Sequence, residues 1–269
     1  MNKIVLFILG LSFSWGLSAQ VVSKQLNVTS AGSLYSLLTA NDLKTITNLT
    51  LTGKLDARDF LIIRDSLKLV DTLDISGVTI EAYSGPGGTY TGNMLGYYFA
   101  NEIPFRAFAS KNKLLSIILP NTITSIDDRA FYSCTALKSI EIPSSVTLLG
   151  IEIFYSCTAL QTVKLPSSIT TISNGTFGFC NKLNNVIIPS SVTSIGIRAF
   201  DHCKGLTDIT IPSSVDTISS WAFNYCTALE SVEIPSSVRL LGENAFYHCD
   251  ALQTVNLPSS ITSINNSTF

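Results

Sequence analysis

Apolar and polar positions alternate in a repeating order along the second half of the chain. The apolar positions of one unit are Leu137, Ile140, Ile142, Val146, Leu149 and Phe154. The segment Ile140-Glu141-Ile142 alternates between inward and outward positions, which is typical of a short strand with one buried face. Pro143 follows it directly. Because proline has no N–H to donate, it predicts the end of the strand.

Three residue types share one step of 23 residues. Prolines stand at Pro120, Pro143, Pro166, Pro189, Pro212, Pro235 and Pro258. Phenylalanines stand at Phe108, Phe131, Phe154, Phe177, Phe200, Phe223, Phe246 and Phe269. The six cysteines are Cys134, Cys157, Cys180, Cys203, Cys226 and Cys249. A single unit this short cannot bury its apolar side, so we expect stacked coils that pair their strands in parallel and share one core.

Two further patterns concern the array as a whole. Turn-forming residues occupy one column, namely Asp127, Gly150, Ser173, Gly196, Ser219, Gly242 and Asn265. Residues 134–177 match residues 226–269 at 32 of 44 positions, which indicates duplication of a block of four units. The array length has therefore been free to change.

The unit resembles the BspA-like class of leucine-rich repeats. The resemblance rests on Cys-Thr-Ala-Leu-Glu-Ser-Val-Glu-Ile-Pro-Ser-Ser-Val (226–238) and on Leu-Leu-Gly-x-x-Ala-Phe-x-x-Cys (240–249), and it covers about 108–269. It implies a right-handed leucine-rich-repeat superhelix, with short parallel strands on the concave face and turns or short helices on the convex side. It also implies an exported or surface-displayed bacterial protein with a role in adhesion to host proteins such as fibronectin. The usual asparagine position holds serine, as at Ser145 and Ser237, so an asparagine ladder is not expected.

The first 105 residues divide into two predicted parts. Residues 1–19 combine Lys3, an apolar run at 4–11 and a small residue at Ala19, which predicts a secretory signal peptide cleaved near Ala19. Residues 20–105 are expected to form an N-terminal cap with helices near 33–38 and after Asp56, and with degenerate strands at 49–51 and 73–75. Within this part, residues 81–104 carry a Gly-Pro-Gly-Gly run and five aromatic residues. They predict a long inserted loop that either binds a partner or covers the side of the solenoid.

Composition excludes several functions. The chain is 13% charged with a formal net charge of -2, which does not fit nucleic-acid binding. No later segment is long and apolar enough to span a membrane.

The cysteines are expected as free, buried thiols rather than disulfides, although adjacent coils are close enough for bridges. His202 and His248 lie two coils apart, too far to share a metal ion, and are expected in an aromatic stripe with Phe179 and Tyr225.

The repeats contain no nucleophile motif, phosphate loop or paired carboxylates, so we expect no enzyme activity, no cofactor and no metal. The candidate binding surface is the outward side of the repeat strands, on which we place Lys138, Glu141, Gln161, Lys164, Asn184, Asp208, Glu230 and Glu233. The sequence thus predicts a secreted or cell-surface, adhesin-like protein that engages a protein or glycan through its sheet face. The alternatives are a structural spacer of the cell envelope and plain solvation of that face.

The array, assigned to 106–269, stops in mid-repeat at Phe269. This ending predicts either a fragment of a longer array or a last coil covered by another molecule. In the isolated chain we expect this end to fray or self-associate.

Overall fold

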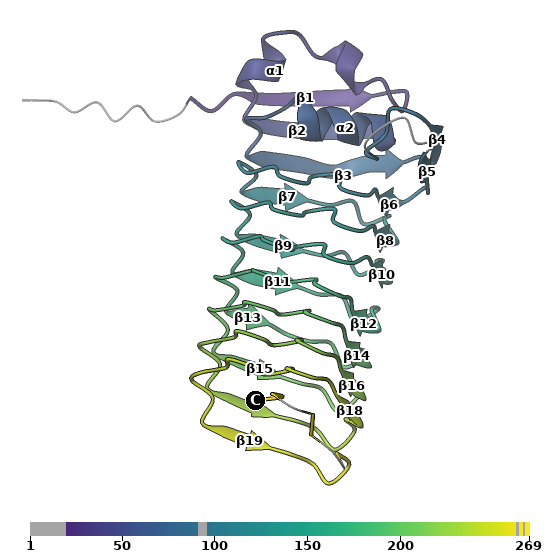
Figure 1. Ribbon diagram of the computed structural model, residues 1–269. Coiled ribbons are helices and arrows are strands. Elements are labelled where there is room, and N and C mark those ends of the chain that lie inside the picture. Colours follow the sequence, from purple (N-terminus) through teal and green to yellow (C-terminus); the bar gives the residue numbers. More distant parts are fainter. Residues whose placement is uncertain (1–19, 91–95, 262–263, 266) are drawn as a thin grey trace, which may run out of the picture.

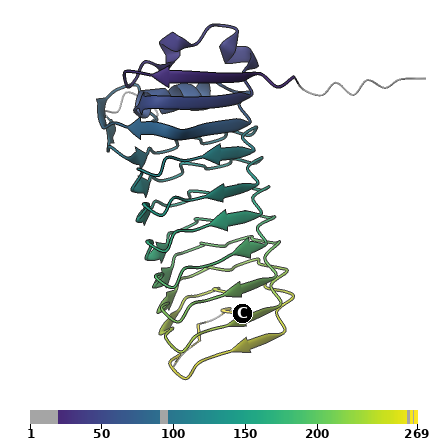
Figure 2. The same ribbon diagram turned by 180° about the vertical axis from the view of Figure 1, so that it is seen from behind.

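The chain forms a rod of stacked coils (Figure 1). The computed structural model describes residues 20–90, 96–261, 264–265 and 267–269, so the predicted signal peptide lies outside the described residues. Ten parallel strands, one from each coil, follow one another along the rod, and Figure 2 shows the same row from behind. We call this row the main sheet. Its strands are β1 (Ser23–Val28), β2 (Asn48–Leu55), β3 (Thr72–Ile80), β7 (Ser116–Ile118), β9 (Ser139–Glu141), β11 (Thr162–Lys164), β13 (Asn185–Val186), β15 (Asp208–Thr210), β17 (Ser231–Glu233) and β19 (Thr254–Asn256).

The register of the main sheet confirms the solenoid predicted from the repeat. Val163 of β11 pairs with Ile140 of β9, and Val232 of β17 pairs with Ile209 of β15. Each pair is separated by 23 residues, so a residue in one coil lies over the same position of the next. The alternation along each strand places these side chains in the core and their neighbours in solvent.

A second row of short parallel strands runs along another side of the rod. Its strands are β6 (Glu102–Ile103), β8 (Ser125–Ile126), β10 (Leu148–Leu149), β12 (Thr171–Ile172), β14 (Ser194–Ile195), β16 (Thr217–Ile218) and β18 (Leu240–Leu241). The sequence analysis did not predict this row, because two residues per coil are too few to show an alternation. The remaining side of each coil consists of turns, and residues 106–261 contain no helix.

The phenylalanine column forms a continuous stack in the core. Centroids of neighbouring rings lie 5.0 to 5.8 Å apart from Phe108 to Phe269, and Phe60 extends the stack edge-on at 5.7 Å from Phe108. Their backbone also joins the coils, since the N–H of Phe177 donates to the carbonyl of Ala199 at 2.8 Å. The rings of the stack from Phe60 to Phe246 are buried, whereas Phe269 at the end of the stack is 44% exposed. Burying each of the buried rings contributes about 1.5–3 kcal/mol, and the stacking adds about 0.5–1.5 kcal/mol.

The cysteine column consists of free, buried thiols, as predicted. Each thiol donates to the carbonyl of the phenylalanine 26 residues earlier, at 3.0 to 3.2 Å; the Cys203 Sγ, for example, bonds the carbonyl of Phe177. Burial raises the pKa of the Cys180 and Cys203 thiols well above its ordinary value. Since the thiolate is the reactive form, these cysteines are structural and inert.

Serine hydroxyls occupy the position at which an asparagine ladder was not expected. Ser191, Ser214 and Ser237 donate to main-chain carbonyls of the preceding coil at 2.6, 2.6 and 2.7 Å. In these coils a serine hydroxyl therefore bonds to a neighbouring coil without asparagine, whereas the hydroxyl of Ser145, in an earlier coil, is buried without a hydrogen-bond partner among the described residues.

The glycines of the turn column serve close packing between coils. Gly196 has no positive φ, whereas Arg198, two residues later, has a φ of 56°. A Cβ on Gly196 would lie 2.8 Å from the backbone nitrogen of Asn174 and 2.9 Å from the carbonyl oxygen of Ile172. The left-handed turn positions are thus filled by residues other than glycine in most coils, and glycine is kept where the backbones approach.

Gly196→Ala should lower the free energy of unfolding by about 1–3 kcal/mol, because the added methyl group overlaps backbone that cannot move aside easily. Ser219→Ala, at the same position of the next coil, is the matched control and should change it by less than about 0.5 kcal/mol. Urea unfolding of both variants measures the difference. Equal stabilities would contradict the assignment of Gly196 to close packing.

The N-terminal region contains three short helices, η1 (Leu34–Leu37), α1 (Asp42–Thr45) and α2 (Ala57–Asp65). Asp56 caps α2 as predicted, and Asp59 completes a capping box with it. Asp59 is buried and also accepts from the N–H groups of Gly32 and Leu34 at 2.6 and 2.9 Å. The predicted helix at 33–38 is one 3-10 turn without a side-chain cap bond. The predicted strands at 49–51 and 73–75 are parts of β2 and β3.

Lys111 occupies the cysteine position of the first complete repeat, one step before Cys134. The neighbour of this coil is α2, and the buried Lys111 Nζ donates to the carbonyls of Ile63 and Leu67 at 2.8 and 2.7 Å. These carbonyls belong to the end of the helix, where main-chain acceptors lack partners. A long donor therefore takes the place of the thiol at this junction. Burial lowers the pKa of Lys111 from 10.5 to about 8.

This pKa predicts how stability depends on pH. Because the folded chain releases the Lys111 proton at about pH 8 and the unfolded chain near pH 10.5, the unfolded state holds more protons between these values, and stability rises with pH across this window. Relative to Lys111→Met, the wild type should gain up to about 3 kcal/mol from pH 8 to 10.5. Urea unfolding at both pH values tests this, and a constant difference between the two proteins would contradict it.

The segment 81–104, predicted as a long loop, contains a short antiparallel hairpin of β4 (Tyr83–Gly85) and β5 (Gly96–Tyr98). Tyr98 is buried and Tyr90 stacks on Phe105 at 4.6 Å, so part of the aromatic set covers the rod. Tyr97 and Phe99 are exposed. The structure therefore supports the covering role for some of these rings, whereas Tyr97 and Phe99 face solvent and Tyr90 is partly exposed. Residues 91–95 lie outside the described part.

Candidate functional site

All eight residues predicted for binding are exposed on the main sheet. Glu141, Lys164 and Glu233 end the strands β9, β11 and β17, and Asp208 begins β15. The other four stand immediately before strands β9, β11, β13 and β17, and they are Lys138, Gln161, Asn184 and Glu230. The structure thus brings the eight side chains to one side of the rod. Their role in binding stays a prediction.

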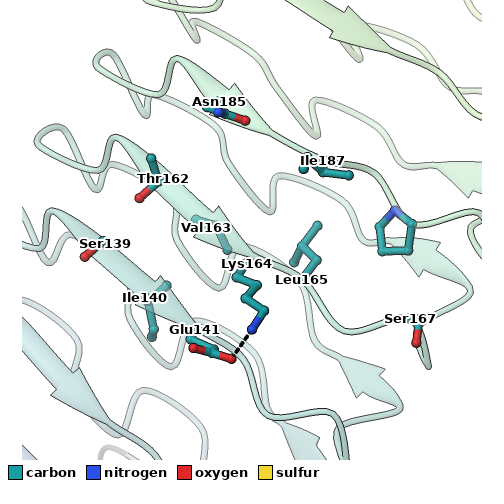
Figure 3. Close-up of a pocket in the computed structure, with 11 residues that line it drawn as sticks. Ser139, Ile140, Glu141, Thr162, Val163, Lys164, Leu165, Ser167, Asn185 and Ile187 are labelled. Atoms are coloured by element: carbon teal, nitrogen blue, oxygen red, sulfur yellow. Dashed lines mark hydrogen bonds and ion pairs between the residues drawn. The ribbon is translucent and has the colours of Figure 1, made fainter.

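An ion pair lies across two strands at the centre of this face. Lys164 is in register with Glu141, and its Nζ lies 2.5 Å from the Glu141 Oε1 (Figure 3). The two side chains are 73% and 67% exposed. Since exposed pairs of this kind contribute only about 0–1 kcal/mol, the pair contributes little to the fold.

Two isoleucines on the same outward column were missing from the sequence prediction. Ile118 ends β7 and Ile187 directly follows β13, so they flank the Glu141–Lys164 pair along the rod. Ile187 is 78% exposed, more than any other large apolar residue among the described ones. The signal was present in the sequence, because Ile118, Glu141, Lys164 and Ile187 follow the 23-residue step. The sequence prediction included only polar residues of this column and therefore omitted Ile118 and Ile187.

Shallow grooves surround this column. One of about 530 Å³ is lined by Glu141, Lys164, Leu165, Ile187 and Pro189 together with their strand neighbours, and Figure 3 shows Leu165 and Ile187 beside the ion pair. An adjoining groove of about 850 Å³ extends the surface toward Ile118. The grooves are open and mixed in polarity, as expected for a surface that meets a macromolecule rather than a small molecule.

The C-terminal part of the main sheet carries charge of one sign. Asp208, Glu230 and Glu233 are exposed there, and none of them forms an ion pair within the described residues. A groove of about 440 Å³ lies beside Asp208 and Glu233. The middle of the sheet, at β9 and β11, carries by contrast Lys138 and the neutralised pair of Glu141 with Lys164. The face is therefore divided into a mixed half and an acidic half.

The predicted aromatic stripe is present on the turn side. His202 stacks between Phe179 and Tyr225, with ring centroids 4.3 and 4.6 Å away, and His248 stacks on Tyr225 at 4.5 Å. The His202 Nδ1 lies 2.7 Å from the carboxylate of buried Asp201. Tyr225 separates the two histidines. In the described part of the chain, no three His, Cys, Asp or Glu side chains are grouped so as to hold a metal ion.

Among the described residues, no helix has the length and apolar character needed to cross a membrane.

The architecture is that of a leucine-rich-repeat solenoid, because it combines stacked coils, a parallel main sheet, and phenylalanine and cysteine columns that follow the repeat. Six copies of the BspA type leucine-rich repeat region match residues 101–230 and 193–269, which together span more than half of the chain. The chain therefore belongs to the BspA type leucine-rich repeat family. No curated protein matches it.

Solved structures of bacterial leucine-rich repeat proteins resemble the chain. A Bacteroides ovatus protein is 34% identical over 52% of this chain and 36% of its own, with a TM-score of 0.50. A T. pallidum protein is 36% identical over 54% of this chain and 69% of its own, also with a TM-score of 0.50. A Eubacterium ventriosum protein matches 83% of this chain and 81% of its own at 21% identity, with a TM-score of 0.55, and supports the fold alone. The chain thus spans about a third of the Bacteroides ovatus protein.

Removing the central ion pair should leave the fold intact. We expect Glu141→Ala and Lys164→Ala, singly and together, to change the free energy of unfolding by less than about 1 kcal/mol, because both side chains are exposed. Thermal unfolding at low and high salt measures this. A larger loss would show that the pair supports the sheet and would make binding data on these variants difficult to interpret.

Proposed function

We propose that this protein is an exported binding protein, of the adhesin type, that engages a protein or glycan through its main sheet. The observation that carries the proposal is the exposure of Ile187 and Ile118 on either side of the Glu141–Lys164 pair, beside open grooves. Leu165 lines the grooves beside both isoleucines, so the apolar surface extends beyond single side chains, and an extended exposed apolar surface is typical of a contact site. The aliphatic character of the two residues favours a protein partner over a glycan.

Two features of the chain support export. The predicted signal peptide at 1–19 directs the chain out of the cytoplasm, and the buried thiols tolerate an oxidising environment because burial suppresses their thiolate form. The repeat array supplies columns rather than a single enclosed site, which supports binding without catalysis.

The experiment compares two variants, each with four substitutions and no change in net charge. The test variant replaces Lys138, Glu141, Lys164 and Glu233 by serine on the main sheet. The matched control replaces the exposed residues Lys182, Asp216, Arg239 and Glu243, which lie off this sheet. Binding of the purified proteins to immobilised extracellular-matrix proteins and to host cells is measured by titration.

We expect the control to bind as the wild type does and the test variant to bind at least about tenfold more weakly, which corresponds to about 1.4 kcal/mol. Both variants should keep the circular dichroism and thermal transition of the wild type. Undiminished binding by the folded test variant would overturn the assignment of the main sheet as the binding surface.

A further inference from the structure

Apolar and charged groups follow a fixed order along the outward column of the main sheet. From the N-terminal side, this column consists of Ile118, Glu141, Lys164, Ile187, Thr210 and Glu233. Since adjacent strands lie about 4.8 Å apart, Ile118 and Ile187 are separated by about 14 Å and Ile187 and Glu233 by about 10 Å. We propose that the bound partner is an extended, cationic peptide segment that runs along the rod, across the strands. This inference rests on the proposed function.

The apolar groups fix the spacing of the peptide. An extended chain rises about 3.3 Å per residue, so two apolar side chains four residues apart lie about 13 Å apart on one side of it. They match Ile118 and Ile187, and the groove between them accepts the intervening side chain beside Leu165. Between the two isoleucines, the charges of Glu141 and Lys164 neutralise each other. This part of the face therefore favours a peptide segment without net charge.

The exposed carboxylates of the acidic half determine that the bound peptide is positively charged. Beyond Ile187 the face presents Asp208, Glu230 and Glu233, without an ion-paired cation within the described part of the chain. A lysine or arginine two or four residues after the second apolar side chain lies on the same side of the extended peptide and reaches this region, because its own length covers the remaining distance. An anionic partner would meet repulsion here, so the face discriminates by charge as well as by fit.

Exposed serines favour an extended backbone over a helix. An exposed serine follows each repeat proline except Pro120, which is followed by Asn121. The column consists of Ser144, Ser167, Ser190, Ser213, Ser236 and Ser259. Ser144, Ser167 and Ser213 border the grooves of the main sheet. An extended peptide carries main-chain donors and acceptors that need partners, whereas a helix satisfies its own. A row of hydroxyls spaced by the strand distance supplies such partners along the path.

The test uses fluorescein-labelled peptides of twelve residues and the full chain. The probe has leucines at positions 3 and 7 and arginine at positions 9 and 11 in a serine and threonine background. One control peptide has glutamate in place of both arginines, and another has both leucines replaced by serine. Fluorescence anisotropy gives the affinities at low and physiological salt.

Three protein variants complete the design. Ile187→Ser removes the apolar anchor, and the combination of Asp208→Asn, Glu230→Gln and Glu233→Gln removes the acidic half. The matched control is the combination of Asp216→Asn, Glu243→Gln and Asp250→Asn, whose residues are exposed off the main sheet. The two triple variants have equal net charge. A difference in their affinities therefore reports a local contact with the peptide rather than the effect of the net charge of the whole protein.

We expect the arginine peptide to bind at least about tenfold more tightly than either control peptide. The acidic-half variant should lose about tenfold in affinity together with most of the salt dependence, the Ile187 variant should lose several-fold, and the matched control should bind normally. Equal binding of the arginine and glutamate peptides, or an equal loss in both triple variants, would overturn the inference. If adhesion still depends on the main sheet in that case, the proposed function stands and only the cationic peptide is wrong.

Discussion

Hydrogen bonding between the backbones of successive coils is the constraint on which the rest of this structure depends. The main sheet, the second row of strands and the bonds at the phenylalanine turns join each coil to the next on three sides. Because these bonds hold successive coils in register, each side chain lies directly against the equivalent residue of the next unit. Only residues that pack well against themselves can then fill the interior, which explains the stacked rings, the thiols that donate to backbone carbonyls, and the glycines where backbones approach.

The same constraint explains why so much of the fold could be predicted. A repeated proline follows each main-sheet strand from β7 to β19, and a repeated phenylalanine and cysteine mark the core, so period and burial are visible together. The second row of strands could not be predicted, because Ser194–Ile195 and its equivalents show no alternation over two residues. The role of Lys111 could not be predicted either, since it depends on where the end of α2 lies in space. The position of the turn column was predicted correctly, but the reason given for its glycines was wrong. Gly196 is needed for close packing between coils and has no positive φ.

The candidate site was partly accessible from sequence. Outward positions of the repeat strands identify one face. All eight chosen residues are exposed, but four of them lie in strands of the main sheet and four immediately before such strands. Sequence reasoning favoured charged residues there and passed over Ile118 and Ile187, whose exposure becomes evident only when the strands are placed side by side. The division of charge likewise appears only in space, because Asp208 and Glu233 are 25 residues apart in the chain and lie on the neighbouring strands β15 and β17.

Lys111 has a consequence for how such a protein can grow. The coils that carry a cysteine present the same surface above and below, so an internal block can be copied and inserted without creating a new kind of junction, as the likeness of 134–177 and 226–269 indicates. The coil that carries Lys111 has two different surfaces, because its amine binds the carbonyls at the end of a helix. A second copy of it deeper in the array would leave a buried ammonium without acceptors. Recombination can therefore lengthen the rod among its interchangeable units while its first unit stays single.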